Sequence, residues 1–193
     1  FLSTPFSREA ANRLIRFGVK AFKIGSGEMN NFPLLDHISK FKKNLIVSTG
    51  MHNLKSVEKT YKFLKKKKLN FALMHTTNLY PTPNHLVRLE SLVEMKKKFK
   101  DVVIGLSDHT KSSHSSLGAV ALGASIIEKH FVDKKSRSGP DISSSIDEKE
   151  LKKLITDCNI IFEQRGGKKN LLKEEQVTRN FAYASVVSIK EIK

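Results

Sequence analysis

Several residue types and patterns are scarce in this sequence, and each scarcity excludes a class of protein. The 193 residues include one cysteine, Cys158, so no intrachain disulfide can form. It lies in a helical pattern, and we expect a buried thiol in a reducing, cytoplasmic compartment. No apolar run of about eighteen residues occurs, so we expect no membrane span. No G-x-G-x-x-G motif follows the first strand-like run, which weakens the case for a dinucleotide-binding fold.

Acidic residues are also scarce: 19 Asp and Glu stand against 35 Lys and Arg, for a formal net charge of +16. Such an excess can indicate a nucleic-acid partner. The lysines, however, gather in short runs at 40–43, 65–68 and 96–100, at the ends of helical patterns, where cations interact favourably with the helix dipole. The aromatic-interleaved pattern of single-strand binders is missing. We therefore expect no nucleic-acid partner; a basic nucleic-acid-binding module is the alternative from another class.

The fold class is predicted by the alternation of short β-prone runs with amphipathic helical stretches. Such units at intervals of about twenty to thirty residues indicate parallel strands joined by helical crossovers. Either an open sheet or a (β/α) barrel would fit, and polar residues at every strand end favour the barrel. A closed barrel needs eight strands, so we expect two units before Phe1. Six runs are predicted, at residues 1–6, 21–28, 44–50, 71–81, 102–110 and 124–131.

The composition changes after Arg165 and predicts a division into three parts. Residues 1–165 should form the partial barrel, and the polar stretch 166–180 should be a linker. Residues 181–193 begin a new apolar, β-prone pattern, which we expect to open a second domain.

Two histidines end consecutive predicted strands, His109 in "LSDHT" and His130 in "EKHF". Neighbouring strands lie roughly 5 Å apart, so both imidazoles could share a divalent manganese, zinc or iron ion. The alternative is two ordinary histidines without a metal, and His75 is a competitor at a similar place. The other four histidines, His37, His52, His85 and His114, are expected at the surface.

Lys23 lies within a strand-like run, where a charge is unfavourable unless it meets an anion. Surrounding hydroxyls would complete a site for a phosphate or carboxylate group; the alternative is a lysine that extends to solvent. The hydroxyls are those of Thr4, Ser26, Ser48 and Ser107, and possible acid–base groups are Glu28, Asp108, Glu128 and Asp141.

Seven segments, in order and in register, resemble the N-acetylneuraminate (sialic acid) synthases. They are "FLSTPF", "FKIGSGE", "IVSTGM", "TTNLYPTP", "IGLSDHT", "EKHF" and "SGPD". The resemblance implies a TIM-like barrel, about six of whose eight units are here, followed by the start of an antifreeze-like (SAF) domain at residues 181–193. It also implies condensation of phosphoenolpyruvate with N-acetylmannosamine, and a divalent metal, usually Mn²⁺.

The resemblance assigns roles to individual residues. It implies that His109 and His130 bind the metal and that Glu28 lies near the reacting carbons. Phosphoenolpyruvate would be held by Thr4, Lys23, Ser26, Ser48 and Ser107, and the sugar by Glu28, Asn78, Tyr80 and Asp141.

Departures from the family pattern and sister enzymes leave alternatives open. Thr76 stands where a cysteine is common, and "RSGPD" lacks the commoner proline after Arg137. Legionaminic and pseudaminic acid synthases share the chemistry and use related 6-deoxy di-N-acetyl hexoses, although "TTNLYPTP" favours the neuraminate branch. The full-length protein should be a domain-exchanged homodimer. Without the first two strands and the SAF domain, we expect this chain alone to be inactive, and its open sheet edges should make it unstable or prone to aggregate.

Overall fold

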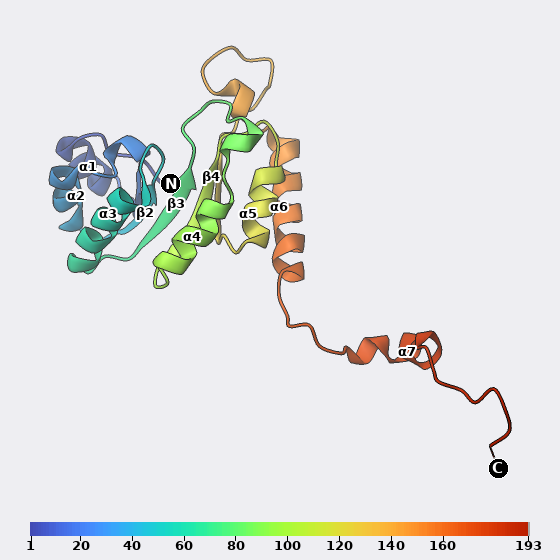
Figure 1. Ribbon diagram of the computed structural model, residues 1–193. Coiled ribbons are helices and arrows are strands. Elements are labelled where there is room, and N and C mark those ends of the chain that lie inside the picture. Colours follow the sequence, from blue (N-terminus) through green and yellow to red (C-terminus); the bar gives the residue numbers. More distant parts are fainter. Residues whose placement is uncertain (193) are drawn as a thin grey trace.

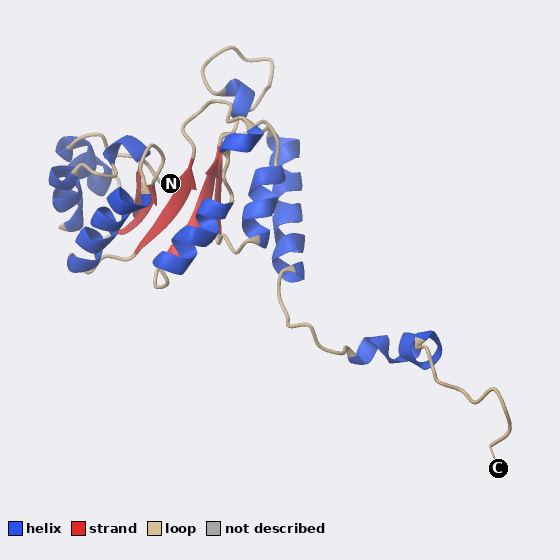
Figure 2. Ribbon diagram, viewed as in Figure 1, coloured by secondary structure: helices blue, strands red, loops and turns tan. Residues whose placement is uncertain are grey.

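Five parallel strands form one curved sheet in the computed structural model, which describes residues 1–192 (Figures 1 and 2). The strands follow one another across the sheet in chain order, and helices cover the outer face. Because neighbouring strands are parallel, each connection crosses over through a helix. The half-barrel predicted from the alternating pattern is confirmed. The strands are β1 (Ala21–Ile24), β2 (Asn44–Ser48), β3 (Phe71–Thr76), β4 (Val103–Asp108) and β5 (Ile126–Lys129).

The prediction of six strands was wrong by one, because the first run does not form a strand. Ser3 makes only an isolated parallel bridge to Phe22, and its carbonyl accepts a hydrogen bond from Lys23 N at 3.1 Å. Pro5 follows at once and has no N–H to continue the ladder. The first run therefore lies beside β1 at the place of a sixth strand, but only one residue pairs.

Polar side chains cap the start of most of the long helices. Ser7, Asn31, Asn53 and Asp147 each accept a hydrogen bond from a backbone N–H in the first helical turn, which satisfies a donor that has no partner within the helix. Lysines lie in the last turns of α3 and α4, as the lysine runs predicted. The helices are α1 (Arg8–Arg16), α2 (Phe32–Ser39), α3 (Leu54–Lys66), α4 (Glu90–Lys98), α5 (His114–Ala121), α6 (Glu148–Gln164) and α7 (Gln176–Ala182).

Successive strand residues alternate between the two faces of the sheet, and the alternation places the core and the site. The outward set packs against the helices as the hydrophobic core: Phe22, Ile24, Leu45, Val47, Leu73, Ile104 and Leu106. The inward set faces the barrel interior and includes Lys23, Ile46, Met74, Gly105, Ser107 and Glu128, which the register places across the sheet. A side chain at Gly105 would collide with Met74 Sδ at 2.5 Å and Ile126 O at 2.6 Å, so that layer has no room for one.

The free edge of β5 borders an apolar groove of about 640 Å³. Ile126 and Ile127 of the strand, Leu154 and Phe162 of α6, and Leu2 from the first run line it. Cys158 lies in the same groove and is half-buried, less than the buried thiol that its helical pattern predicted. This edge shows that the sheet is open, as the strand count predicted.

The chain after Arg165 leaves the sheet and extends away from it (Figure 1). Two short helices lie there, the 3-10 helix η4 (Lys173–Glu175) and α7, which crosses the boundary predicted at residue 180. Residues 183–192 contain no strand, and Lys193 lies outside the described residues, so the start of an SAF domain stays a prediction. No helix of residues 1–192 has both the length and the apolar character needed to cross a membrane.

Candidate functional site

The inward side chains at the carboxyl ends of the strands meet at the mouth of the half-barrel. Lys23 Nζ donates to Ser48 Oγ at 2.6 Å and lies 3.6 Å from Glu128 Oε1. Ser107 Oγ donates to the same Glu128 oxygen at 2.7 Å. Burial lowers the pKa of Lys23, and the nearby Glu128 carboxylate partly opposes that change. The structure therefore brings together one buried cation, two hydroxyls and a single carboxylate from β1, β2, β4 and β5.

A second group of predicted residues lies beside the first, around Gly50. Ser26 begins the 3-10 helix η1 (Ser26–Glu28) after β1, and its Oγ accepts a hydrogen bond from Gly50 N at 3.0 Å. Asn78 Oδ1 is buried and has no hydrogen-bond partner among the described residues. Thr4 lies against Gly25. An unpartnered buried amide oxygen is unfavourable by roughly 1–3 kcal/mol unless water or a bound molecule supplies a donor.

His109 and His130 lie side by side at the mouth, with ring centroids 5.2 Å apart. Tyr80 packs on both, at 4.2 Å from the His109 ring and 5.5 Å from the His130 ring. His109 Nδ1 is 2.8 Å from Thr77 O, and because a carbonyl can only accept, Nδ1 carries the proton. Burial lowers the pKa of His109, which favours the neutral imidazole with an unprotonated Nε2.

The two imidazoles suit a metal ion to which the protein supplies only part of the coordination. Two imidazoles are acceptable ligands for Mn²⁺, Fe²⁺ or Zn²⁺, and a hydrogen bond from Nδ1 to a carbonyl is the usual outer contact of a histidine ligand. Asp141 Oδ2 lies 3.9 Å from His130 Nδ1. No group of three or more His, Cys, Asp or Glu in residues 1–192 is arranged to hold a metal. The chain thus fits a metal only if water or substrate completes the coordination, and the metal stays a prediction.

Glu28 and Asp141 make no hydrogen bond or ion pair with Lys23 within residues 1–192. Glu28 is half-buried in η1, and its Oε2 accepts a hydrogen bond from Asn31 Nδ2 at 2.6 Å. Within the described residues it makes no hydrogen bond or ion pair with another predicted site residue. Asp141 precedes the 3-10 helix η3 (Ile142–Ser144) in a left-handed conformation with φ 65°. The roles of both residues stay predictions.

Asp108 was a candidate acid–base group, and that placement was wrong. It faces outward and forms an ion pair with Lys129, with Asp108 Oδ2 and Lys129 Nζ 3.1 Å apart. His75 also faces outward, and its Nε2 is 2.7 Å from Val87 O, so it does not compete for a metal at the mouth. The contacts of Glu128 with Lys23 and Ser107, and the close approach of Gly50 and Asn78, were not predicted. Period-two alternation from Ser107 could have assigned Asp108 to the outer face.

Comparisons with known proteins identify relatives of the chain. The sequence model of the NeuB family matches residues 1–170. The chain is 45% identical to N,N'-diacetyllegionaminic acid synthase of Campylobacter jejuni over all of this chain and 59% of that protein. It is 36% identical to pseudaminic acid synthase of the same species, over 99% of this chain and 56% of that protein.

A solved structure shows the same fold. The N-acetylneuraminic acid (sialic acid) synthetase of Leptospira borgpetersenii, crystallised with citrate, superposes with a TM-score of 0.86 at 34% identity, covering 92% of this chain and 62% of that one. The chain thus spans about three fifths of the length of the curated relatives described above, at 59% and 56%. The match over residues 1–170 shows that the chain belongs to the NeuB family.

Proposed function

We propose that this chain is the phosphoenolpyruvate- and metal-binding part of a synthase that makes a nine-carbon 2-keto sugar acid. The reaction would join phosphoenolpyruvate to an N-acylated hexosamine and release phosphate. The observation that carries the proposal is the Lys23 ammonium at the mouth of the half-barrel, with a side chain only 15% exposed, which contacts the Ser48 hydroxyl and shares the Glu128 carboxylate with the Ser107 hydroxyl. A cation with several hydroxyl donors suits the phosphate and carboxylate of phosphoenolpyruvate.

The side chains of the mouth would hold the two substrates in line. Lys23, Ser48 and Ser107 would bind the anion, and the unpartnered Asn78 Oδ1 would accept a hydrogen bond from a donor brought by substrate or ordered water. C3 of phosphoenolpyruvate forms a bond to the aldehyde carbon of the open-chain sugar, and the aldehyde oxygen takes up a proton. Water adds at C2, and the C–O bond to phosphate then breaks to leave the 2-keto acid. Fixing the reacting atoms in this way supplies much of the rate.

A divalent metal, when bound, would supply positive charge that polarises the sugar aldehyde. His109 and His130 are the residues that would hold it, with Tyr80 packed on both rings. Glu28 and Asp141 would contact the sugar, as would the exposed face of Tyr80, which is 45% exposed. Glu128 accepts a hydrogen bond from Ser107 and forms an ion pair with Lys23, and it would move from Lys23 when the anion enters.

Two amino sugars are candidates for the second substrate. The motif "TTNLYPTP" favours N-acetylmannosamine, and the sialic acid synthetase structure supports that choice. The relative with 45% identity bears the name of an N,N'-diacetyllegionaminic acid synthase, which supports the di-N-acetylated 6-deoxy sugar instead. We place the di-N-acetylated sugar first, because that identity extends over the whole chain.

Phosphate release tests both the reaction and the sugar. The protein in its full natural length is incubated with phosphoenolpyruvate and Mn²⁺, first with the di-N-acetylated 6-deoxy sugar and then with N-acetylmannosamine. We expect sugar-dependent release with one of them and loss of release with a chelator. Release with neither sugar, or equal release without any sugar, would contradict the proposed condensation.

A further inference from the structure

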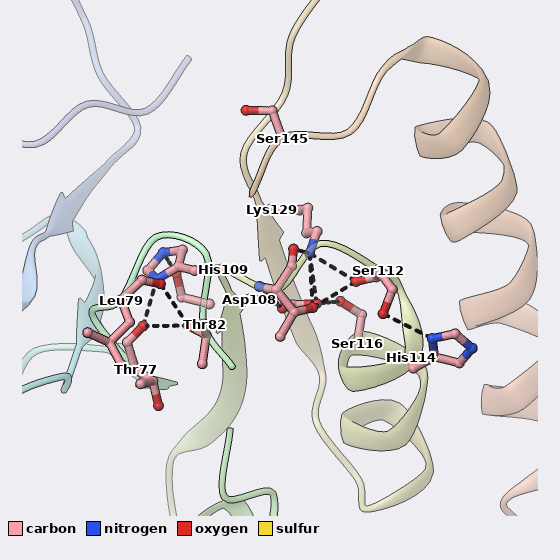
Figure 3. A network of polar contacts seen from close by, with 12 residues as sticks. Thr77, Leu79, Thr82, Asp108, His109, Ser112, His114, Ser116, Lys129 and Ser145 are labelled. Carbon is pink, nitrogen blue, oxygen red and sulfur yellow. Dashed lines mark hydrogen bonds and ion pairs between the residues drawn. The ribbon is translucent and has the colours of Figure 1, made fainter. Parts of the chain in front are cut away.

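Lys129 and Asp108 form a buried ion pair on the outer face of the sheet, away from the mouth. Their side chains are 3% and 1% exposed. Besides Asp108 Oδ2 at 3.1 Å, Lys129 Nζ donates to Thr110 O at 2.5 Å and to Ser112 O at 3.0 Å. Figure 3 shows the lysine pointing into the loop that joins β4 to α5. The cation is surrounded by acceptors of the chain itself, so no vacancy for a ligand remains around it.

Asp108 also accepts hydrogen bonds from this loop and from the helix that follows it. Its Oδ1 accepts a hydrogen bond from Thr110 N at 2.8 Å, and its Oδ2 accepts one from Ser116 Oγ at 2.7 Å. Residues 108–116 are therefore folded around the ammonium group of Lys129. The end of β4 and the loop contact this group directly, and the first turn of α5 is attached through Asp108 (Figure 3). We call Asp108, Lys129 and the carbonyls of Thr110 and Ser112 the outer clamp.

The outer clamp borders both histidines of the candidate metal site. His109 lies between the clamp residues Asp108 and Thr110, and His130 directly follows Lys129. On the inner side, His109 is held through its ring by Thr77 O, and its carbonyl accepts a hydrogen bond from Thr82 N at 2.9 Å. The β4–β5 ladder ends at the pair Asp108 and Lys129, and the clamp adds a side-chain link there between the backbone that carries one imidazole and the backbone that carries the other.

We propose that Lys129 and Asp108 are positioning residues that set the separation and orientation of the His109 and His130 imidazoles. They act through the backbone and do not touch substrate, because both side chains face the helices. This inference rests on the metal assignment of the proposed function. Desolvation offsets much of the attraction in a buried ion pair, so net stability alone is a weak reason for such an arrangement.

The test is Mn²⁺ binding to the metal-free, full-length protein, measured by calorimetry and by the electron paramagnetic resonance signal of free Mn²⁺. Removing one partner leaves a buried unpaired charge and can unfold the domain. The main variant is therefore the double substitution Asp108→Asn with Lys129→Met, and Lys129→Met alone is the second. We expect Mn²⁺ binding to weaken roughly ten- to a hundredfold, as for other groups that orient metal ligands. The affinity for phosphoenolpyruvate without metal should change little, because Lys23 lies on the inner face.

Arg165 supplies the matched control. Its Nη1 donates to Val120 O at 2.8 Å and Ala124 O at 3.2 Å, so it also holds a loop between α5 and β5 by two carbonyls, but before β5 rather than after it. Arg165→Met should lower the melting temperature and leave the Mn²⁺ affinity unchanged. That contrast separates positioning from general stability.

Two results would overturn the inference, and they differ from failure of the proposed reaction. A folded double variant that binds Mn²⁺ as tightly as the wild type would show that the clamp does not position the histidines. A wild-type protein that releases phosphate but binds no Mn²⁺ would overturn the metal assignment and this inference together, and would leave the condensation standing. Weak Mn²⁺ binding in the double variant but not in Arg165→Met would support it.

Discussion

Lys23 and Lys129 lie near the carboxyl ends of β1 and β5, with side chains 15% and 3% exposed, and their surroundings differ. Burial lowers the pKa of both. Lys129 faces outward and is paired with Asp108 and two carbonyls within 3.1 Å. Lys23 faces inward, and within 3.1 Å it contacts only the neutral Ser48 Oγ, at 2.6 Å, while Glu128 lies 3.6 Å away. A buried cation with weak pairing is available to a substrate anion, whereas a fully paired one serves the structure.

The largest effect should come from removing the inward lysine. Lys23→Met keeps a similar length without the charge, so the substrate anion loses the positive charge of Lys23 at the mouth. We expect the rate of phosphate release to fall roughly a hundred- to a thousandfold. Steady-state kinetics with varied phosphoenolpyruvate would measure this. The melting temperature should not fall, because the charged ammonium is penalised by burial in the wild type.

Lys67→Met is the matched control for this substitution. Lys67 forms an ion pair with Asp36 at the helical surface, far from the mouth. We expect its kinetics to equal those of the wild type. Equal activity in Lys23→Met and Lys67→Met would show that the inward lysine matters no more for the reaction than a surface lysine does.

The contrast between the inward and outward faces of the sheet also explains which site residues the sequence predicted correctly and which it did not. Polar residues at strand ends predicted the half-barrel, and Lys23, Ser48 and Ser107 lie together as expected. Asp108 was misplaced, because its type suggested chemistry while its position, next to Ser107, placed it on the outer face. The first run failed as a strand because Pro5 interrupts it. Contacts such as that of Gly50 with Asn78 join separate loops, and residue patterns do not encode them.

The second effect should come from filling the space at Gly50. A Cβ there would lie 1.7 Å from Asn78 Oδ1 and 2.9 Å from Ser26 Oγ, so Asn78 must move in Gly50→Ala. Displacing a substrate-holding group by about 1 Å can lower the rate up to a hundredfold. We expect kcat/KM for the amino sugar to fall roughly ten- to a hundredfold, measured by the same phosphate assay with varied sugar.

A double-mutant cycle would show whether Gly50 acts through Asn78. Residues in contact give non-additive effects. If the amide oxygen is the group displaced, Gly50→Ala should add little to the loss already caused by Asn78→Ala. Full additivity of the two substitutions would mean that the alanine disturbs the mouth by another route, such as the bond from Gly50 N to Ser26 Oγ.

The smallest effect concerns the outward His75 and appears only in the pH dependence of stability. Burial lowers the pKa of His75 from its ordinary 6.5, although the hydrogen bond to Val87 O partly opposes that change. Between the lowered pKa and 6.5, the unfolded chain binds a proton at this residue and the folded chain does not. The free energy of unfolding therefore rises with pH through this window, and the stability is fully present above 6.5 and lost in acid.

His75→Gln isolates this contribution, because glutamine keeps an N–H donor for Val87 O and does not titrate. His109 also has a lowered pKa and gives the wild type a slope of the same sign, so only the difference between the two proteins is informative. Urea unfolding from pH 5 to pH 8 should show curves that are parallel in the upper range and converge as the pH falls, since the wild type alone loses the His75 term. Curves that stay parallel throughout would show that this outward histidine accepts a proton as readily in the folded chain as in the unfolded one. His75 would then differ from Lys129, the other outward side chain whose partners lie within the fold.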